Sequence, residues 1–451
     1  MKSKLLVSAA IALVVSSSQA NAEESINQKI DRLEQEIQLL KRQNEVSEEK
    51  QKAAAEKAAT VEYGEKGLTI TSPDKSASIK IKGYAQADSR SFLDNSNTSN
   101  VDQFLLRTAR VSIDGKFQDD FGGKLTYDFG NNNPKLVDAY VDYKADPALN
   151  IRLGKFKAPI GLERLQSETE ISAIERGLTA NLTPSRDVGI QVSGEVIPQT
   201  LEYQLALTNG AASGADSSTD IDGPKDVVAR IFAHPFRESD FASLQGFGVG
   251  VAGSFGQRDG TTAAGNSNLT SGYKSEGQGT IFSYNPAAGT SYSNGDNWRI
   301  NPEAYYYNGS LGLLSEYVLE TQEVTNVAKT QKLQNDAWSA QASYVITGED
   351  ASYEGVKPEE NFSPSKGNWG AFEVLGRIGK LDIDNDTFPT FANPNSSVSS
   401  AFEKTIGFNW YLNNNLKFNT AYTETSFDGG AAAGADRETE KLIGTRAQFK
   451  F

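Results

Sequence analysis

One segment, residues 152–186, concentrates side chains that can bind an anion. Its six basic residues are Arg152, Lys155, Lys157, Arg164, Arg176 and Arg186, and its four acidic residues are Glu163, Glu168, Glu170 and Glu175. The segment therefore carries a net charge of +2, whereas the whole chain carries −14. Basic side chains in a narrow, partly dehydrated passage replace water around an oxyanion, and arginine offers phosphate a two-pronged contact. This pattern predicts an anion path. The alternative is that the bases pair with the four glutamates and only hold the segment in place.

Other kinds of chemistry find little support in the sequence. His234, in "RIFAHPF", is the single histidine available as a general base, and no serine stands in a nucleophile-elbow context. The acidic stretches at 216–222 and 382–386 could bind calcium, but their spacing fits no EF-hand loop, and solvated turn residues are the commoner explanation. The chain has no cysteine, which excludes disulfides and cysteine-ligated metals. We therefore expect no enzyme, no cofactor and no metal site.

The first residues predict export. "MKSKLLVSAAIALVVSSSQANA" has two lysines, an apolar run over 5–15 and an A-x-A cleavage site, which together indicate a signal peptide at residues 1–22. No later stretch approaches the roughly 18 apolar residues of a membrane-spanning helix. Removing Lys2 and Lys4 takes the charge from −14 to −16. Nucleic acid is thus not an expected partner, because phosphate backbones attract basic surfaces.

Residues 23–60 predict a short coiled coil. The segment contains no Gly, Pro or aromatic residue. Its heptad a positions are Ile30, Ile37 and Asn44, and its d positions are Ile26, Leu33 and Leu40. Charged residues fill most other places, as in coiled coils. A lone helix of this kind is marginal in water, so we expect the segment to self-associate.

From Val61 onward the hydrophobic period changes to two. In "GTRAQFKF" at the end of the chain, Thr445, Ala447, Phe449 and Phe451 share one face, and Arg446, Gln448 and Lys450 share the other. Many stretches alternate in this way, and tight turns such as "LNNNLK" separate them from long polar loops such as "TNGAASGADSSTDIDGP". A soluble β-sandwich also alternates, but it has less need of long loops or a terminal aromatic strand. The pattern favours an all-β fold, a transmembrane antiparallel β-barrel of about 16 strands over residues 61–451.

The alternation fails after Gly154. The helix-like "LERLQSETEISAIERGL" follows, and strand character returns at "VGIQVSG". We therefore predict an inward-folded insertion at about 155–187 that narrows a pore. The stretch "GKFKAPIGLER…IERG…PSRDVG" resembles the phosphate-selective porin family, porins O and P. So do "FLLRTARVSIDGKF", "RIFAHPF", "WGAFEVLGRIGKLDID" and the closing "RAQFKF", so that the resemblance covers nearly the whole chain after the signal.

The resemblance implies a 16-stranded trimeric barrel with basic residues along an anion path. Arg164 takes the place of a constriction lysine in that family, and Lys80 matches a lysine of the lumen. Arg152, Lys155 and Arg107 match further basic positions. Two departures weaken the case for tight phosphate selectivity. Tyr84 replaces an arginine, and loop 256–280 carries only Arg258 and Lys274 where the family has an arginine ladder.

These observations predict a porin of the Gram-negative outer membrane that admits small anions, with phosphate among the candidates. Its expected partners are membrane lipid, anionic solutes, two further copies of the chain in a homotrimer, and a periplasmic or cell-wall contact through the coiled coil. Arg164 is expected near Lys80 at the narrowest and most positive point, and Lys274 out in a screened loop. The alternatives are a general diffusion porin without anion preference, and a structural barrel with a stalk that anchors the envelope.

Overall fold

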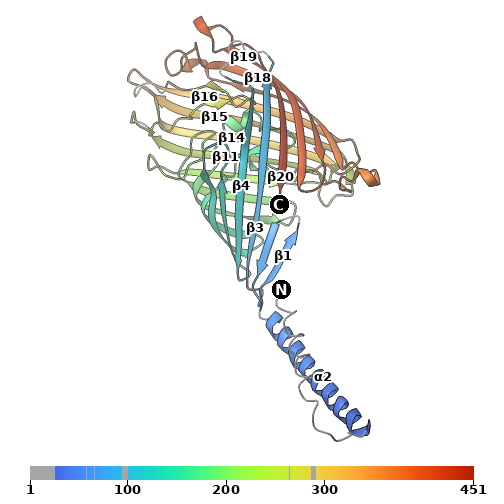
Figure 1. Cartoon of the computed structure of the whole chain (residues 1–451). Helices are drawn as coiled ribbons and strands as arrows, with labels where there is room; N and C mark the ends of the chain where they lie inside the picture. Colours follow the sequence, from blue (N-terminus) through green and yellow to red (C-terminus); the bar gives the residue numbers. More distant parts are fainter. Residues whose placement is uncertain (1–25, 57, 65–66, 94–99, 264, 286–290) are drawn as a thin grey trace. The chain divides into compact units, whose positions relative to one another are not determined.

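The computed structural model describes residues 26–56, 58–64, 67–93, 100–263, 265–285 and 291–451 (Figure 1). The signal peptide predicted at 1–22 lies outside these residues. The chain divides into two units, with the boundary between Ala59 and Thr60. Each unit is described by itself below.

The first unit contains one long helix, α2 (Ile26–Glu56). Its apolar seam is uncovered in the single chain, because the side chains of Ile30, Leu33, Ile37 and Leu40 are 47–58% exposed. Self-association of this helix stays a prediction. Among the described residues, no helix is both long and apolar enough to cross a membrane.

The second unit is a closed antiparallel barrel (Figure 1). Its main sheet has 18 strands; two of them, β1 and β2, form a hairpin attached to the beginning of β3, and the other 16 make the wall. The wall strands are β3 (Ala77–Phe92), β4 (Gln103–Phe117), β5 (Phe121–Asp128), β6 (Lys135–Asp146), β7 (Leu149–Phe156), β8 (Asp187–Ile197), β9 (Leu201–Thr208), β10 (Asp226–Ala233), β11 (Phe247–Asp259), β14 (Tyr292–Asn308), β15 (Leu311–Thr325), β16 (Thr330–Val345), β17 (Ala371–Asp382), β18 (Val398–Tyr411), β19 (Leu416–Gly429) and β20 (Glu440–Lys450). Pairing of β20 with β3 closes the ring, which confirms the barrel of about 16 strands predicted from the sequence.

The second unit begins with the hairpin of β1 (Thr60–Gly64) and β2 (Gly67–Thr71). β2 pairs with the beginning of β3, with Leu68 opposite Ile81, and β20 pairs with the rest of β3, with Lys450 opposite Tyr84. The hairpin therefore continues the sheet along the same edge of β3, and the closed wall begins only at Ala77.

Side chains alternate across the wall as the sequence predicts. On β20, Arg446 and Gln448 are buried inside, whereas Phe449 is 49% exposed on the outer face. Phe451 exchanges both backbone hydrogen bonds with Gly83, at 2.9 and 3.0 Å. Its ring stacks on that of Phe449, so the last residue completes the closure on the outer side of the wall.

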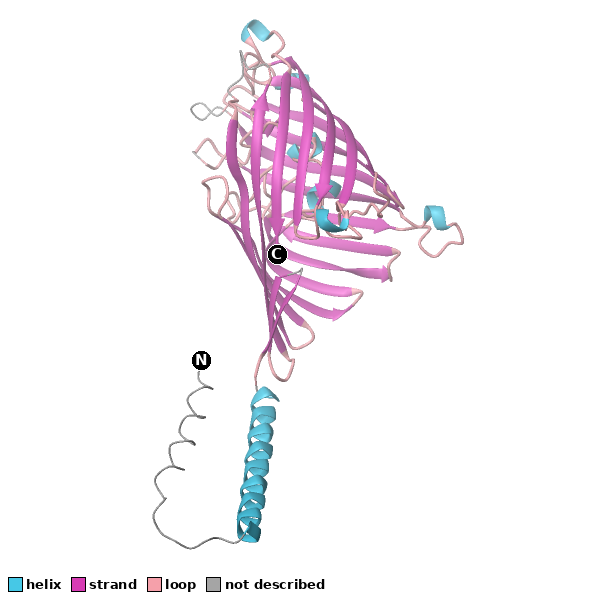
Figure 2. Ribbon diagram, turned by 45° about the vertical axis from the view of Figure 1, so that its right-hand side comes forward, coloured by secondary structure: helices cyan, strands magenta, loops and turns pink. Residues whose placement is uncertain are grey.

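Loops fold into one side of the barrel and form the main apolar core. The insertion between β7 and β8 spans residues 157–186 and contains α3 (Leu162–Leu165) and the short helix η1 (Leu178–Asn181). The loop between β11 and β14 contains the small ribbon of β12 (Tyr273–Lys274) and β13 (Thr280–Phe282). Both loops pack on inward residues of β15 to β18, where the core members include Leu178, Leu182, Tyr273, Phe282, Val318 and Leu381. Figure 2 shows the curved wall, the loops and the short helices, of which the others are η2 (Ala242–Leu244), η3 (Pro364–Lys366), η4 (Asn385–Thr387) and η5 (Ala432–Gly434).

Gly154 of β7 requires the absence of a side chain. Its φ is +133°, a conformation that other residues rarely adopt, and a Cβ there would collide with the carbonyl oxygen of Ala139 on β6. The strand continues in register to Phe156, which lies opposite Asp187, and the insertion begins at the next residue.

Candidate anion-binding site

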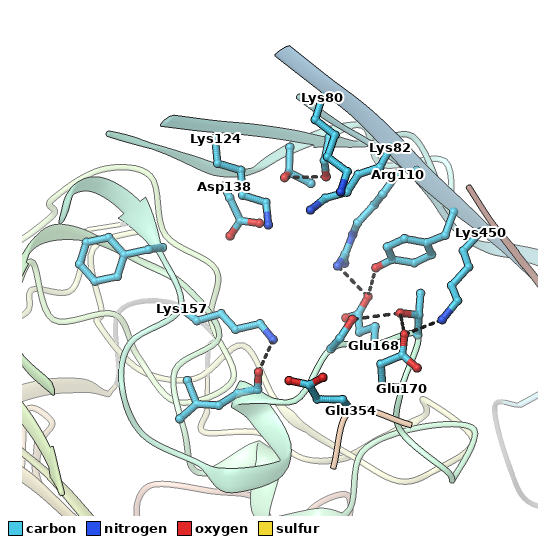
Figure 3. Close-up of a pocket in the computed structure, with 18 of the residues that line it drawn as sticks. Lys80, Lys82, Arg110, Lys124, Asp138, Lys157, Glu168, Glu170, Glu354 and Lys450 are labelled. Carbon is cyan, nitrogen blue, oxygen red and sulfur yellow. Dashed lines mark hydrogen bonds and ion pairs between the residues drawn. The ribbon is translucent and has the colours of Figure 1, made fainter. Parts of the chain in front are cut away.

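A cavity of about 780 Å³ lies between the insertion and the wall formed by β3 to β8 (Figure 3). It is located toward the terminal end, by which we mean the end of the barrel where β3 begins and β20 finishes. Nine basic and four acidic side chains line it, an excess of five positive charges. The basic ones are Lys80, Lys82, Arg110, Lys124, Arg152, Lys157, Arg186, Lys357 and Lys450, and the acidic ones are Asp138, Glu168, Glu170 and Glu354.

Three lysines of the wall come from inward positions on β3 and β5, the two strands on either side of β4. Lys80 and Lys82 belong to β3, and Lys124 belongs to β5. In Figure 3 Lys124 points toward Asp138 of β6. Lys82 forms an ion pair with Asp114 of β4. Strand alternation therefore directs these side chains into the cavity.

Two of the arginines in the cavity wall are paired with carboxylates. Arg152 Nε lies 2.7 Å from Asp142 Oδ1, and its guanidinium stacks 4.0 Å above the centre of the Tyr140 ring. Arg186 Nε lies 3.1 Å from Asp138 Oδ1. Such pairs hold the guanidinium groups in place and reduce the positive field that they contribute.

Lys157, the first residue of the insertion, is held differently. Its Nζ donates to the carbonyl oxygens of Leu165 and Gln166, at 3.1 and 2.8 Å. Burial, followed by repulsion from Arg176 and Arg186, lowers the pKa of Lys157 well below its usual value. The carbonyl groups carry no formal charge, so when protonated this ammonium adds nearly its whole charge to the cavity.

Arg164 does not reach the cavity. This residue of α3 donates through its guanidinium to the carbonyl oxygen of Ala180, and its Nε is buried without a hydrogen-bond partner among the described residues. Burial, followed by Arg176 and Arg186, lowers its pKa. Lys80 lines the cavity and Arg164 does not, so the expected meeting of the two in the lumen is not seen. The proposed role of Arg164 in ion preference stays a prediction.

Lys155 and Arg107, also predicted from the sequence, lie outside the cavity lining. Lys155 Nζ lies 2.6 Å from Asp216 Oδ1 and donates to Ser218 Oγ, so it holds down the loop between β9 and β10. Arg107 Nε lies 2.7 Å from Glu175 of the insertion. Both residues are therefore occupied by structural contacts.

The insertion is clamped to the wall through two of its glutamates. Glu175 accepts hydrogen bonds from Arg90, Arg107 and Arg446, at 2.8, 2.7 and 2.9 Å. Glu163 lies 3.2 Å from Arg377 of β17. These contacts hold the insertion against the wall, but the arginines that make them belong to wall strands and not to the segment 152–186.

A second inward loop, residues 346–370 between β16 and β17, was not predicted. The hydroxyl of Tyr353 donates to the carbonyl oxygen of Leu162 at 2.5 Å, and Gln166 Nε2 donates to the carbonyl oxygen of Tyr353 at 2.7 Å. Glu354 and Lys357 of this loop line the cavity. The loop thus supports the insertion from the terminal end.

Sequence reasoning also missed several bases of the lining: Lys82, Arg110, Lys124, Lys357 and Lys450. All except Lys357 occupy inward strand positions, so the alternation could have found them. The side chain of Lys274 is exposed, and its weak effect on ion preference stays a prediction. The backbone N–H of Lys274 donates to Asn181 Oδ1 at 2.9 Å, and Asn181 Nδ2 donates back to its carbonyl oxygen at 3.0 Å. The loop around Lys274 therefore lies against the insertion.

His234 lies at the terminal end of β10, with its Nε2 atom 2.7 Å from the hydroxyl oxygen of Tyr305. Within the described ranges, no group of three or more His, Cys, Asp or Glu side chains is arranged to hold a metal ion.

Residues 79–451 match the model of the family described as "Phosphate-selective porin O and P". Porin O of Pseudomonas aeruginosa is 24% identical over 407 residues, which cover 85% of this chain and 91% of that protein. Among solved structures, the outer membrane channel DcaP of Acinetobacter baumannii aligns with a TM-score of 0.55 and 12% identity, over 83% of this chain and 98% of that one. OmpF of Salmonella typhi aligns with a TM-score of 0.52 and 12% identity, over the same shares of the two chains.

Proposed function

Because the chain belongs to the family of phosphate-selective porins O and P, we propose that it conducts small anions passively across the outer membrane, and that phosphate is one of them. The relative Porin O and the family model carry the porin assignment. The preference for anions rests on one observation, the excess of five positive charges around the cavity.

The excess is significant because the chain as a whole is acidic, with a formal charge of −14. A positive lining therefore requires selective placement of the bases. In bulk salt solution, charges farther apart than about 8–10 Å are screened, but inside a narrow passage the screening is weaker. An oxyanion that sheds part of its hydration shell there regains favourable contacts from Lys and Arg.

The arrangement suits flux more than tight capture. Arg152 and Arg186 are already paired with carboxylates, and Lys157 is bound to carbonyl groups. Conduction requires that a solute enter readily and leave readily, so a weak site is adequate. No catalytic role is proposed.

Short turns of outer-membrane barrels face the periplasm. The terminal end carries most of the short turns here, so we assign it, and the cavity, to the periplasmic side. We further propose that three copies assemble and that α2 takes part in the assembly.

The test is the reversal potential of single channels in a KCl gradient, followed by titration of the chloride current with phosphate. We expect a potential of the sign of anion preference and block by phosphate. A potential near zero or of the opposite sign would favour the general diffusion porin. The pairing of Arg152 and Arg186 with carboxylates, which reduces their positive field, is consistent with that alternative. Absence of conductance would favour the structural anchor.

A further inference from the structure

The carboxylate of Glu168 occupies a group of donors that would suit an oxyanion. Arg110 Nη1 lies 2.7 Å from Oε2, Arg176 Nη1 lies 3.1 Å from Oε1, and the hydroxyl of Tyr84 donates to Oε2 at 2.8 Å. Two guanidinium groups and one hydroxyl are the donors that proteins use to bind phosphate and carboxylate. The two arginine side chains are only 9% and 11% exposed, and the Glu168 side chain is 17% exposed and lines the cavity (Figure 3).

The donors are held in place by partners other than this carboxylate. Arg110 Nε donates to Asp128 Oδ2 at 2.8 Å. Arg176 Nε donates to the carbonyl oxygen of Glu163 at 2.9 Å, and its Nη2 donates to that of Gln166 at 3.0 Å. The arginines would therefore keep their positions if the carboxylate were removed, and the site is pre-formed.

The backbone beside Glu168 is also fixed independently of its side chain. Gln86 Nε2 donates to the carbonyl oxygen of Glu168 at 3.3 Å. Gln448 Nε2 and Lys417 Nζ donate to the carbonyl oxygen of Thr169, at 3.0 and 3.1 Å. A change of the Glu168 side chain should thus leave the course of the insertion unaltered.

Glu168 remains ionised in this setting. Burial acts to raise its pKa, but the charges of Arg110, Arg176 and Arg186 outweigh this effect and hold the pKa well below its usual value. The group is therefore a permanent negative charge at neutral pH and occupies the donors throughout.

We propose that Tyr84, Arg110 and Arg176 form a binding site for small oxyanions, and that Glu168 is a tethered competitor for it. An oxyanion in the cavity must share or displace this carboxylate to reach the donors. Glu168 accordingly sets how strongly the channel binds its solute, and keeps the binding weak enough for release. The proposal rests on the proposed function and assigns a specificity-determining role to one residue of the pathway.

The test compares Glu168→Ala with Glu170→Ala in the full-length channel. Glu170 is a matched control, because it stands two residues away and also lines the cavity. Glu170→Ala removes the same charge as Glu168→Ala, but Glu170 pairs with Lys450 instead of the two arginines. The measurement is the concentration of inorganic phosphate that halves the chloride current. Without the Glu168 carboxylate, the charged donors can make their hydrogen bonds to phosphate and so strengthen its binding. We therefore expect Glu168→Ala to lower the half-blocking concentration of phosphate by about tenfold. For Glu170→Ala we expect a change below about twofold, as for a partly exposed pair.

A further variant identifies the donors and another guards against misfolding. Arg176→Gln added to Glu168→Ala should return the half-blocking concentration toward the wild-type value. Glu168→Gln keeps the size of the side chain without its charge and should also strengthen the block. Equal effects at Glu168 and Glu170, or weaker block in both Glu168 variants, would overturn the proposal. Phosphate block can be measured whatever the ion preference of the wild type, so failure of the proposed function would be seen separately, in the reversal potential.

Discussion

At the scale of single residues, the charge that a base contributes depends on its partner. Arg152 and Arg186 line the cavity beside carboxylates, whereas Lys157 lies on carbonyl oxygens. Arg164 is also bound to a carbonyl oxygen, but it is absent from the lining. Of the three lining bases Arg152, Arg186 and Lys157, only Lys157 contacts carbonyl oxygens instead of a carboxylate, so in its protonated form its charge is the least offset of the three.

We predict that Lys157→Gln lowers the anion-to-cation permeability ratio more than Arg164→Gln does. A Coulomb energy of about 0.7 kcal/mol between the lost charge and an ion in the cavity corresponds to a change of roughly threefold. The reversal potential in a KCl gradient measures both variants against the wild type. A larger shift for Arg164→Gln would restore the prediction, made from the sequence, that this residue sets the ion preference.

At the scale of elements, the insertion could be predicted and its attachment could not. The loss of alternation after Gly154 locates the end of β7 within two residues, because the strand ends at Phe156. The clamp of Glu175 with Arg90, Arg107 and Arg446 joins residues far apart in the chain. A local sequence pattern does not indicate which distant arginine or lysine will form an ion pair with a buried carboxylate. Sequence reasoning therefore could not separate the bases that attach the insertion to the wall from those that line the cavity.

The same limit applies to the loop over 346–370. Its position among the short turns of the terminal end gives no sign that Tyr353 will hydrogen-bond to the insertion. The inward bases of the strands are a different case. Lys82 and Lys124 follow directly from the period of two, and a systematic count of inward positions would have found them.

The closure of β20 on β3 leads to a prediction for the last residue. Deleting Phe451 removes two backbone hydrogen bonds to Gly83 and the stacking with Phe449, each worth about 1 kcal/mol. We expect the fraction of chain assembled as a folded, heat-modifiable barrel in the membrane to fall several-fold while total synthesis is unchanged.

The control is Phe451→Tyr, which keeps the backbone bonds and an aromatic ring and should assemble like the wild type. Normal assembly of the deleted chain would contradict the view that the terminal residue completes the wall.

At the scale of the whole molecule, the barrel is filled unevenly. The apolar core lies on the inner face of β15 to β18, and the cavity lies along β3 to β8. A solute therefore meets one charged wall and one insertion rather than a ring of equivalent strands. The excess of base on that wall coexists with a net charge of −14 because the acids are placed elsewhere or used in clamps.

The other unit poses a separate question of assembly. α2 leaves its apolar seam exposed in the single chain, although burial of such side chains contributes about 1.5–3 kcal/mol each. Association of several copies through this seam would bury it and would raise the stability of a trimer. We predict that seam variants of the full-length chain form less stable oligomers, with barrels that remain folded and conducting. The four positions to be changed to Ser are Ile30, Leu33, Ile37 and Leu40.

Oligomer stability is measured as the temperature at which the extracted protein dissociates in detergent, and barrel folding by conductance in bilayers. A matched control changes four residues on the opposite side of the helix to Ser, namely Gln28, Gln35, Arg42 and Glu49. These occupy the f positions of the heptad, which face solvent in a coiled coil, so the control should dissociate at the wild-type temperature. If the seam and control variants dissociate alike, the contacts between copies belong to the barrels alone, and the helix has another role.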